Sequence, residues 1–151
     1  MKKITTLVMA SLCSIMLLTG CGATAVSQSD FKEYIEESNY EYQEYSEGID
    51  SQFACESAIA VKISDNAIVE FYIFEDGVNS TNMYNAAKEN IEEAYTSKVT
   101  TFTNIGNKKT FTCKADDEYY RISSVGNTLL YGYTNNGSVD EIDKVFDNFK
   151  Y

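Results

Sequence analysis

The chain of 151 residues contains no histidine, no tryptophan and no proline. Without histidine it lacks the commonest general base, the commonest metal ligand, and the base of the serine and cysteine nucleophile pairs. Acidic residues outnumber basic ones by 23 to 12, so we expect no nucleic-acid partner. An apolar fraction of 44% is nevertheless that of a folded chain, and the length allows one ordinary domain.

The motifs of several enzyme classes are also missing. The sequence contains no Gly-x-Ser-x-Gly elbow, no phosphate-binding glycine loop and no EF-hand calcium loop. We therefore expect no catalytic residue, no metal and no cofactor. One enzymatic alternative remains, a carboxylate-dependent hydrolase, because glycoside hydrolysis needs only two carboxylates across a cleft. With 23 acids such a pair arises by chance, so we favour a solvated acidic surface.

The N-terminus has the organisation of a bacterial sorting signal. A basic start, Met1-Lys2-Lys3, precedes an apolar run of 12 residues from Leu7 to Leu18. A bilayer-spanning helix needs roughly 20 residues, so this run is too short to remain as a span. The run ends in Leu18-Thr19-Gly20-Cys21, which resembles the lipobox of bacterial lipoproteins. That resemblance implies cleavage after Gly20 and a diacylglycerol on the thiol of Cys21; the alternative is an ordinary secretory signal.

Lipid attachment would make the membrane a partner of this chain. Two acyl chains hold a protein stably, so the resemblance implies a location on the extracytoplasmic face of the cell membrane. Residues 21–29 are small and polar and predict a flexible tether, followed by one domain at residues 30–151. Loss of residues 1–20 removes two lysines and leaves 23 acids against 10 bases, a net charge of −13. We expect so acidic a domain to stand off an anionic bilayer.

The periodicity of apolar residues predicts an α+β fold. Helices are expected from Asp30 to Ser38, from Ser80 to Tyr95, and from Ser138 to the end of the chain. Residues 39–52 are predicted to be irregular or extended. We expect an antiparallel sheet of five to six strands with the helices packed mainly on one face. The predicted strands are residues 58–64, 67–74, 99–102, 109–113, 119–123 and 128–133.

Two stretches of the chain resemble each other. Residues 53–69 and 111–130 share an order of motifs and each precedes a helix, which suggests a strand-strand-helix repeat; coincidence explains the likeness equally well. The repeat would place Cys55 and Cys113 at equivalent positions. A disulfide between them is compatible with a location outside the cytoplasm, and two buried thiols are the other reading.

Three tyrosines in the acidic stretch are candidate ligand contacts. Tyr40, Tyr42 and Tyr45 lie among carboxylates, and such tyrosines suit a surface protein, a peptide or a glycan. The alternative, which we favour, is that they cover the sheet as an amphipathic layer.

The last third of the chain carries a second resemblance. The stretch from Arg121 to Tyr131, RISSVGNTLLY, and the closing helix are similar to small uncharacterised surface lipoproteins of low-GC Gram-positive bacteria. This resemblance implies a location and no mechanism. The sequence thus predicts a lipid-anchored extracytoplasmic protein with a non-enzymatic binding role. The alternatives are the carboxylate-dependent hydrolase and an accessory subunit of an envelope complex.

Overall fold

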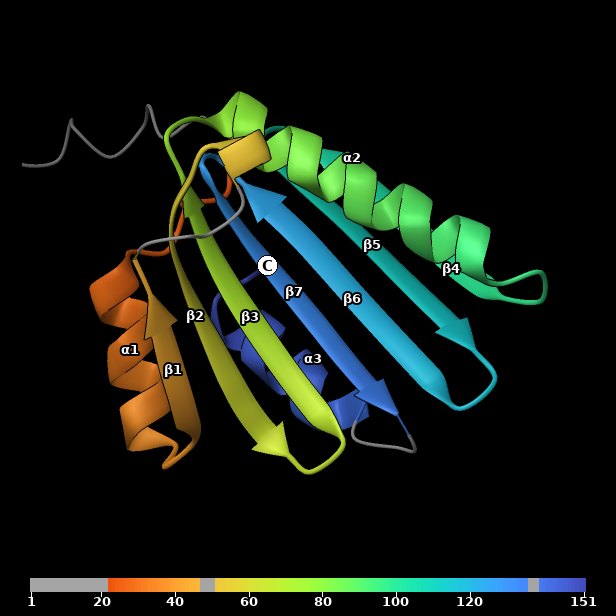
Figure 1. Ribbon diagram of the computed structural model, residues 1–151, viewed down its shortest axis with the longest axis horizontal. Coiled ribbons are helices and arrows are strands. Elements are labelled where there is room, and N and C mark those ends of the chain that lie inside the picture. Colours follow the sequence, from red (N-terminus) through yellow and green to blue (C-terminus); the bar gives the residue numbers. More distant parts are fainter. Residues whose placement is uncertain (1–21, 47–50, 136–138) are drawn as a thin grey trace, which may run out of the picture.

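The computed structural model describes residues 22–46, 51–135 and 139–151, which form an antiparallel sheet with helices on both faces (Figure 1). The seven strands follow the order β1-β2-β3-β7-β6-β5-β4. Along the chain the elements are α1 (Gln28–Glu37), β1 (Glu41–Tyr45), the 3-10 turn η1 (Ser51–Phe53), β2 (Cys55–Ser64), β3 (Ala67–Phe74), α2 (Gly77–Ala94), β4 (Val99–Ile105), β5 (Lys108–Ala115), β6 (Glu118–Val125), β7 (Thr128–Asn135) and α3 (Val139–Asn148).

Short turns connect most neighbouring strands. Gly106, Asp116 and Gly126 each begin a two-residue turn and have φ values of +62°, +50° and +58°. Positive φ at this position is typical of the turns that match the twist of a β-hairpin, and glycine and aspartate tolerate it. The two halves of the sheet meet where β3 pairs with β7, with Val69 opposite Gly132.

The α+β class and the antiparallel sheet are confirmed, and β3 has the predicted bounds. The predicted strand count of five to six was too low. The missing strand is β1, whose sequence Glu-Tyr-Gln-Glu-Tyr is almost entirely exposed at the sheet edge. Because no apolar residue alternates there, the pattern carried no strand signal. The first helix also begins earlier than expected, with the side chain of Ser27 as its N-cap.

The helices do not lie mainly on one face, contrary to the prediction. Phe31 and Ile35 of α1 and Phe146 of α3 pack on one face against Val69 and Phe71 of β3. On the other face α2 packs over a second buried cluster drawn from β3, β5, β6 and β7. In the central strands β3 and β7 the side chains that point to one face and those that point to the other are both buried. Each face of the sheet therefore has to be covered by a helix.

The two strand-strand-helix units do not form a two-fold pair. The order occurs as β2-β3-α2 and as β6-β7-α3, but α2 and α3 cover opposite faces of the sheet. A two-fold axis perpendicular to the sheet would place both helices on the same face. The likeness is therefore one of local order only.

The segment before α1, which the sequence predicts as a flexible tether, packs against the domain at residues 23–26. Ala23, Ala25 and Val26 pack against the buried cluster beneath α1 and α3. The Asn107 side chain donates a hydrogen bond of 2.9 Å to the carbonyl oxygen of Ala23, and the Val26 amide donates one of 3.2 Å to the hydroxyl of Tyr151. Small apolar side chains fit this narrow site, so the composition that suggested freedom instead permits docking. We call residues 22–27 the N-terminal segment.

The predicted apolar run at residues 7–18 and the predicted lipid attachment site Cys21 lie outside the described residues. Within the described part of the chain, none of the helices has the length and apolar character required to span a bilayer.

Candidate binding face

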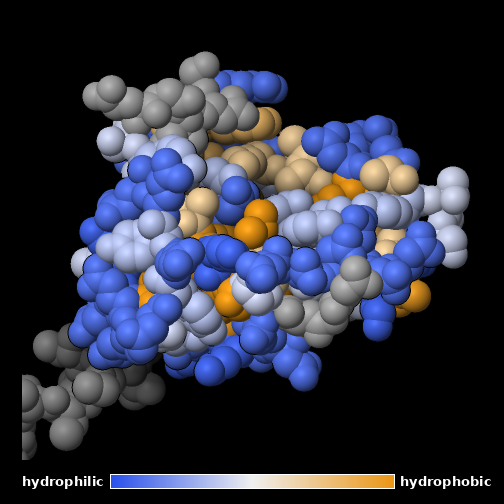
Figure 2. Space-filling view, turned by 60° about the horizontal axis from the view of Figure 1, so that its bottom comes forward, coloured by the Kyte–Doolittle hydropathy of each residue, from blue (hydrophilic) through white to orange (hydrophobic). Residues whose placement is uncertain are grey.

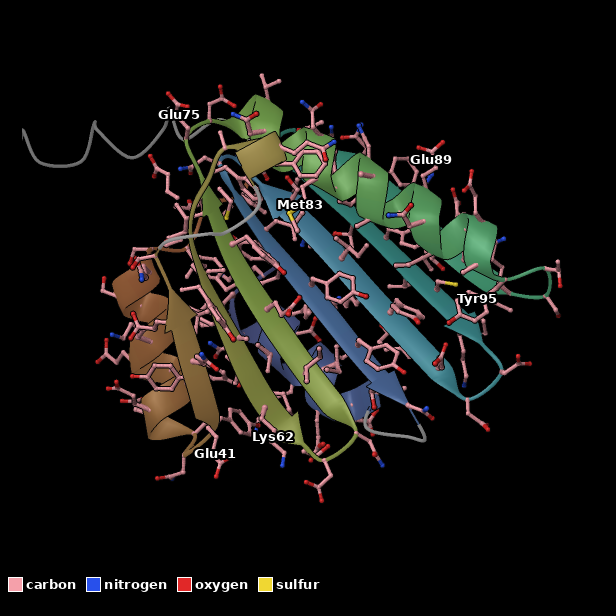
Figure 3. All side chains as sticks on the ribbon, in the orientation of Figure 1. Glu41, Lys62, Glu75, Met83, Glu89 and Tyr95 are labelled. Carbon is pink, nitrogen blue, oxygen red and sulfur yellow. The ribbon has the colours of Figure 1, made fainter. Side chains whose placement is uncertain are left out.

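The α2 side of the sheet is only partly covered, and five tyrosines gather beside the helix. Side chains alternate between the two faces along each strand, and one alternate set from each of β3, β7 and β6 lies on this face. Tyr95 is the C-cap of α2 (Figure 3). All five side chains are half-buried. We call this set the tyrosine face: Tyr72, Tyr95, Tyr120, Tyr131 and Tyr133, with the carboxylates of Glu70 and Glu118.

Glu118 is the centre of the hydrogen bonding on this face. It is the first residue of β6, and its carboxylate accepts hydrogen bonds from the hydroxyls of Tyr133 at 2.9 Å and Tyr120 at 3.1 Å, and from that of Tyr95. The Tyr95 and Tyr120 hydroxyl oxygens also lie 2.8 Å apart, so the proton of one of them is shared between Glu118 and the other hydroxyl. These bonds, that from Tyr95 first, hold the pKa of Glu118 below its ordinary value. Glu118 is therefore a carboxylate at neutral pH, an acceptor and not a general acid.

The rings pack against each other as well as against the sheet. The centroid of Tyr120 lies 5.0 Å from that of Tyr133 and 6.4 Å from that of Tyr131. On β3 the Tyr72 hydroxyl donates to Glu70 at 2.7 Å. Burial, as the main cause, raises the pKa values of Tyr72, Tyr120 and Tyr131. These hydroxyls therefore stay protonated, and the face offers aromatic rings beside negative charge.

The tyrosine face continues towards the β1 edge of the sheet. Ile68 of β3 lies opposite Tyr133 on one side and Lys62 on the other, and Ala60 lies opposite Glu70. The small side chain of Ala60 leaves a hollow of about 310 Å³, which Gln43, Tyr45 and Ile68 also line. From β1 to β6 the continuous surface spans four strand spacings, about 19 Å. An extended ligand could lie across this width.

The three tyrosines singled out from the sequence do not form one site, although Tyr42 and Tyr45 both line the hollow. Tyr40 and Tyr42 pack against the cluster beneath α1, and the Tyr42 hydroxyl donates to Glu36 at 2.7 Å. Tyr45 alone lies on the α2 side, 41% exposed, at the edge of the hollow.

The two cysteines are also kept apart, so the structure contains no bridge between them. Cys55 begins β2, where its thiol donates to the carbonyl oxygens of Ser57 and Ile73, while Cys113 is buried in β5. Four strand spacings, about 19 Å, separate β2 from β5, whereas a disulfide needs Cα atoms within about 7 Å.

Tyr72, Tyr95, Tyr120 and Tyr131 were not among the tyrosines singled out from the sequence, and each packs beside the buried cluster beneath α2. The alternation of side chains along the strands could have revealed the face. Glu118 and Tyr120 lie two residues apart and share one face of β6, and Tyr131 and Tyr133 likewise share one face of β7. A strand in which successive tyrosines alternate with small residues presents polar tips on one side. Within the described ranges, no group of three or more cysteines and carboxylates is arranged to hold a metal ion.

Comparisons with known proteins add little to this description. No protein-family model matches the chain, and no curated protein matches it. A solved structure of a GTP binding regulator from Thermotoga maritima is similar with a TM-score of 0.48 and 12% identity, covering 82% of this chain and 87% of that one. A likeness of this size assigns no activity to the present chain.

Proposed function

We propose that this chain is a lipid-anchored extracytoplasmic domain that binds a cationic, extended ligand, such as a basic segment of a surface protein, on the tyrosine face. The anchoring rests on the Leu18-Thr19-Gly20-Cys21 motif. The binding role rests on one observation. Five tyrosines and two carboxylates from four elements share a sheet surface that α2 leaves partly open.

The chemistry of the face favours a cation. Tyrosine rings attract ammonium and guanidinium groups through their negative π faces, and carboxylates pair with the same groups. Glu118 is held ionised by its tyrosine partners. Lys62, the basic side chain at the edge of the hollow, is paired with Asp65 at 2.7 Å. The net charge of −13 of the processed chain adds a long-range attraction for basic partners.

The test is a calorimetric titration with lysine- and arginine-rich peptides and with neutral oligosaccharides of similar length. Binding of the peptides that weakens with added salt is expected. Glu118→Gln should reduce this affinity about ten-fold, the order of a lost charged contact. Glu89→Gln makes the same change of charge on an exposed site of α2 (Figure 3) and should leave it unaltered.

Equal peptide affinity in Glu118→Gln and Glu89→Gln would contradict a site on the tyrosine face. Binding of the neutral oligosaccharides in preference to the peptides would retain the site and replace the ligand class. Anchoring has its own test, since replacement of Cys21 by alanine should abolish incorporation of a labelled fatty acid.

A further inference from the structure

The N-terminal segment determines which end of the domain a lipid attached to Cys21 would be near. Ala23 is tied to the β4–β5 turn by Asn107, and a side chain added at Gly22 would lie 3.1 Å from that same asparagine. Val26 is tied to Tyr151, and Ala25 lies against Gly126 in the β6–β7 turn. Cys21 directly precedes Gly22 in the sequence, so no residue lies between the proposed attachment site and this segment. The domain is thus connected to the lipid without a long spacer.

We propose that the β4–β5 turn end of the sheet rests on the bilayer surface, so that the protein has one fixed orientation on the membrane. This inference depends on the lipid anchoring in the proposed function. We call this part, with Val78, Ile105, Lys108 and Lys109, the anchor end. It replaces the picture of an acidic domain standing off the membrane on a tether.

The side chains at the anchor end suit a bilayer surface. Ile105 is 68% exposed at the end of β4, and Val78 is 66% exposed in the first turn of α2. Val78 lies near the N-terminal segment, because a Cβ added at its neighbour Gly77 would lie 3.1 Å from the carbonyl oxygen of Gly126, and one added at Gly126 would lie 3.6 Å from Ala25. Lys108 and Lys109 follow the turn. The Lys108 amine donates to the carbonyl oxygen of Lys150 and the Lys109 amine to the Thr81 hydroxyl, so both positive charges are held at this end, where basic side chains favour anionic headgroups. Exposed aliphatic side chains beside basic ones are typical of membrane-contacting surfaces.

The opposite end of the sheet has a different character. Its turns are Asp65-Asn66 and Asp116-Asp117, and Glu118 follows directly. Figure 2 turns the lower end of the Figure 1 view forward and shows hydrophilic residues over most of it. The anchor end also carries the exposed Glu75 and Asp76, so the contrast between the two ends lies in Val78, Ile105 and the two lysines.

The proposed orientation also places the tyrosine face. Val125, which adjoins the β6–β7 turn, lies seven residue steps along β6 from Glu118, and seven steps along a strand span about 24 Å. Glu118 and its tyrosine partners would thus lie well above the bilayer, where a basic ligand can reach them.

Tryptophan fluorescence can test the orientation, because the chain contains no tryptophan. Ile105→Trp and Asp117→Trp each introduce a single probe at an exposed site, one at either end. The lipidated proteins are reconstituted in phosphatidylcholine–phosphatidylglycerol vesicles with and without brominated lipid. We expect Ile105→Trp to lose emission with brominated lipid and to shift to the blue, and Asp117→Trp to do neither.

Equal emission from the two probes would overturn the inference. Val78→Trp provides a second probe at the anchor end, and it should behave as Ile105→Trp does. The intact mass of the protein, recorded before reconstitution, distinguishes a failure of the lipid anchoring from a failure of the proposed orientation. A mass without diacylglycerol overturns the anchoring itself, whereas lipidated protein with equal quenching at both ends overturns only the orientation.

Discussion

The hydroxyl of Tyr133 donates a hydrogen bond of 2.9 Å to Glu118 across strands β7 and β6. The two residues are diagonal neighbours on one face, because Glu118 pairs with Asn135, two residues beyond Tyr133. Tyr95 brings the end of α2 to the same carboxylate. One side chain therefore joins two strands and a helix, and it also supplies the charge of the proposed binding face.

Glu118 should make the stability of the protein depend on pH in a defined direction, and its replacement should remove this dependence. A carboxyl group whose pKa is lowered by folding stabilises the protein above its unfolded pKa, about 4.3, and this contribution is lost as pH falls through the folded value. Glu118→Gln should lower the free energy of unfolding at pH 7 by about 1 kcal/mol. Urea denaturation at pH 7 and at low pH measures this difference, which should shrink on acidification. Glu89→Gln should show no such difference, and a constant gap at all pH values would contradict the assignment.

The tyrosine face should also respond to alkali, with the opposite sign. Burial raises the pKa values of Tyr72 and Tyr131 above the ordinary value of 10.0. Stability from such groups is complete below pH 10 and is lost as pH rises towards the folded pKa. Absorbance at 295 nm should show tyrosines that ionise only with loss of ellipticity. Tyr131→Phe should reduce this alkaline dependence, and an unchanged pH profile would show that Tyr131 is accessible in the folded state.

Gly132 controls how closely α3 approaches the sheet. A Cβ atom at this position would lie 2.6 Å from Ile142 and 2.9 Å from Phe146, both of α3. Gly132→Ala must displace the helix, so we expect a loss of about 2 kcal/mol. Thr134→Val, two residues along β7, is a control in the same strand, because the buried Thr134 hydroxyl makes no hydrogen bond. This second variant should leave the melting temperature unchanged or raise it.

The sequence predicted those elements whose residues follow a local rule. β3 is a run of β-branched and aromatic residues beside a polar turn, and its bounds were predicted correctly. β1 was missed because its pairing with β2, not its apolar content, makes it a strand. The faces of the helices could not be derived, since β3 and β7 bury both sides and either helix could have packed on either.

The candidate site depended still more on tertiary structure. The sequence singled out Tyr40, Tyr42 and Tyr45 as candidate contacts but favoured their role as a cover of the sheet, and Tyr40 and Tyr42 do pack against the cluster beneath α1. Tyr72 and Tyr131 resemble core residues in their own strands, and only the pairing of β3 with β7 places them side by side. The packing of the N-terminal segment against the domain likewise depends on Asn107 and Tyr151, which are distant from that segment in sequence.

The two cysteines should behave as independent thiols. Alkylation of the unfolded protein in the absence of reductant should modify both Cys55 and Cys113, since the sheet order keeps them apart. In the folded protein Cys113 is fully buried, and burial raises its pKa, so it should react far more slowly than the half-buried Cys55. Mass spectrometry of tryptic peptides follows both rates. Protection of both cysteines from alkylation until reductant is added would contradict the strand order.

Arg121 should be the most sensitive polar residue in the region that joins the sheet to α3. Its guanidinium donates to Asp143 at 2.8 Å, to Asp147 at 2.9 Å and to the carbonyl oxygen of Tyr151 at 2.8 Å. It also lies 4.8 Å from the centre of the Phe146 ring. Lysine has a single ammonium and cannot reach all of these partners, so Arg121→Lys should cost about 2 kcal/mol despite the retained charge.

The acidic partners of Arg121 provide graded controls for this last variant. The side chain of Asp143 is 35% exposed and that of Asp147 is 70% exposed. Because water screens the more exposed pair, Asp147→Asn should be nearly silent and Asp143→Asn should be destabilising. A double-mutant cycle between positions 121 and 143 measures the coupling directly. A coupling energy indistinguishable from zero would show that the arginine acts through its packing on Phe146 instead of through its charge.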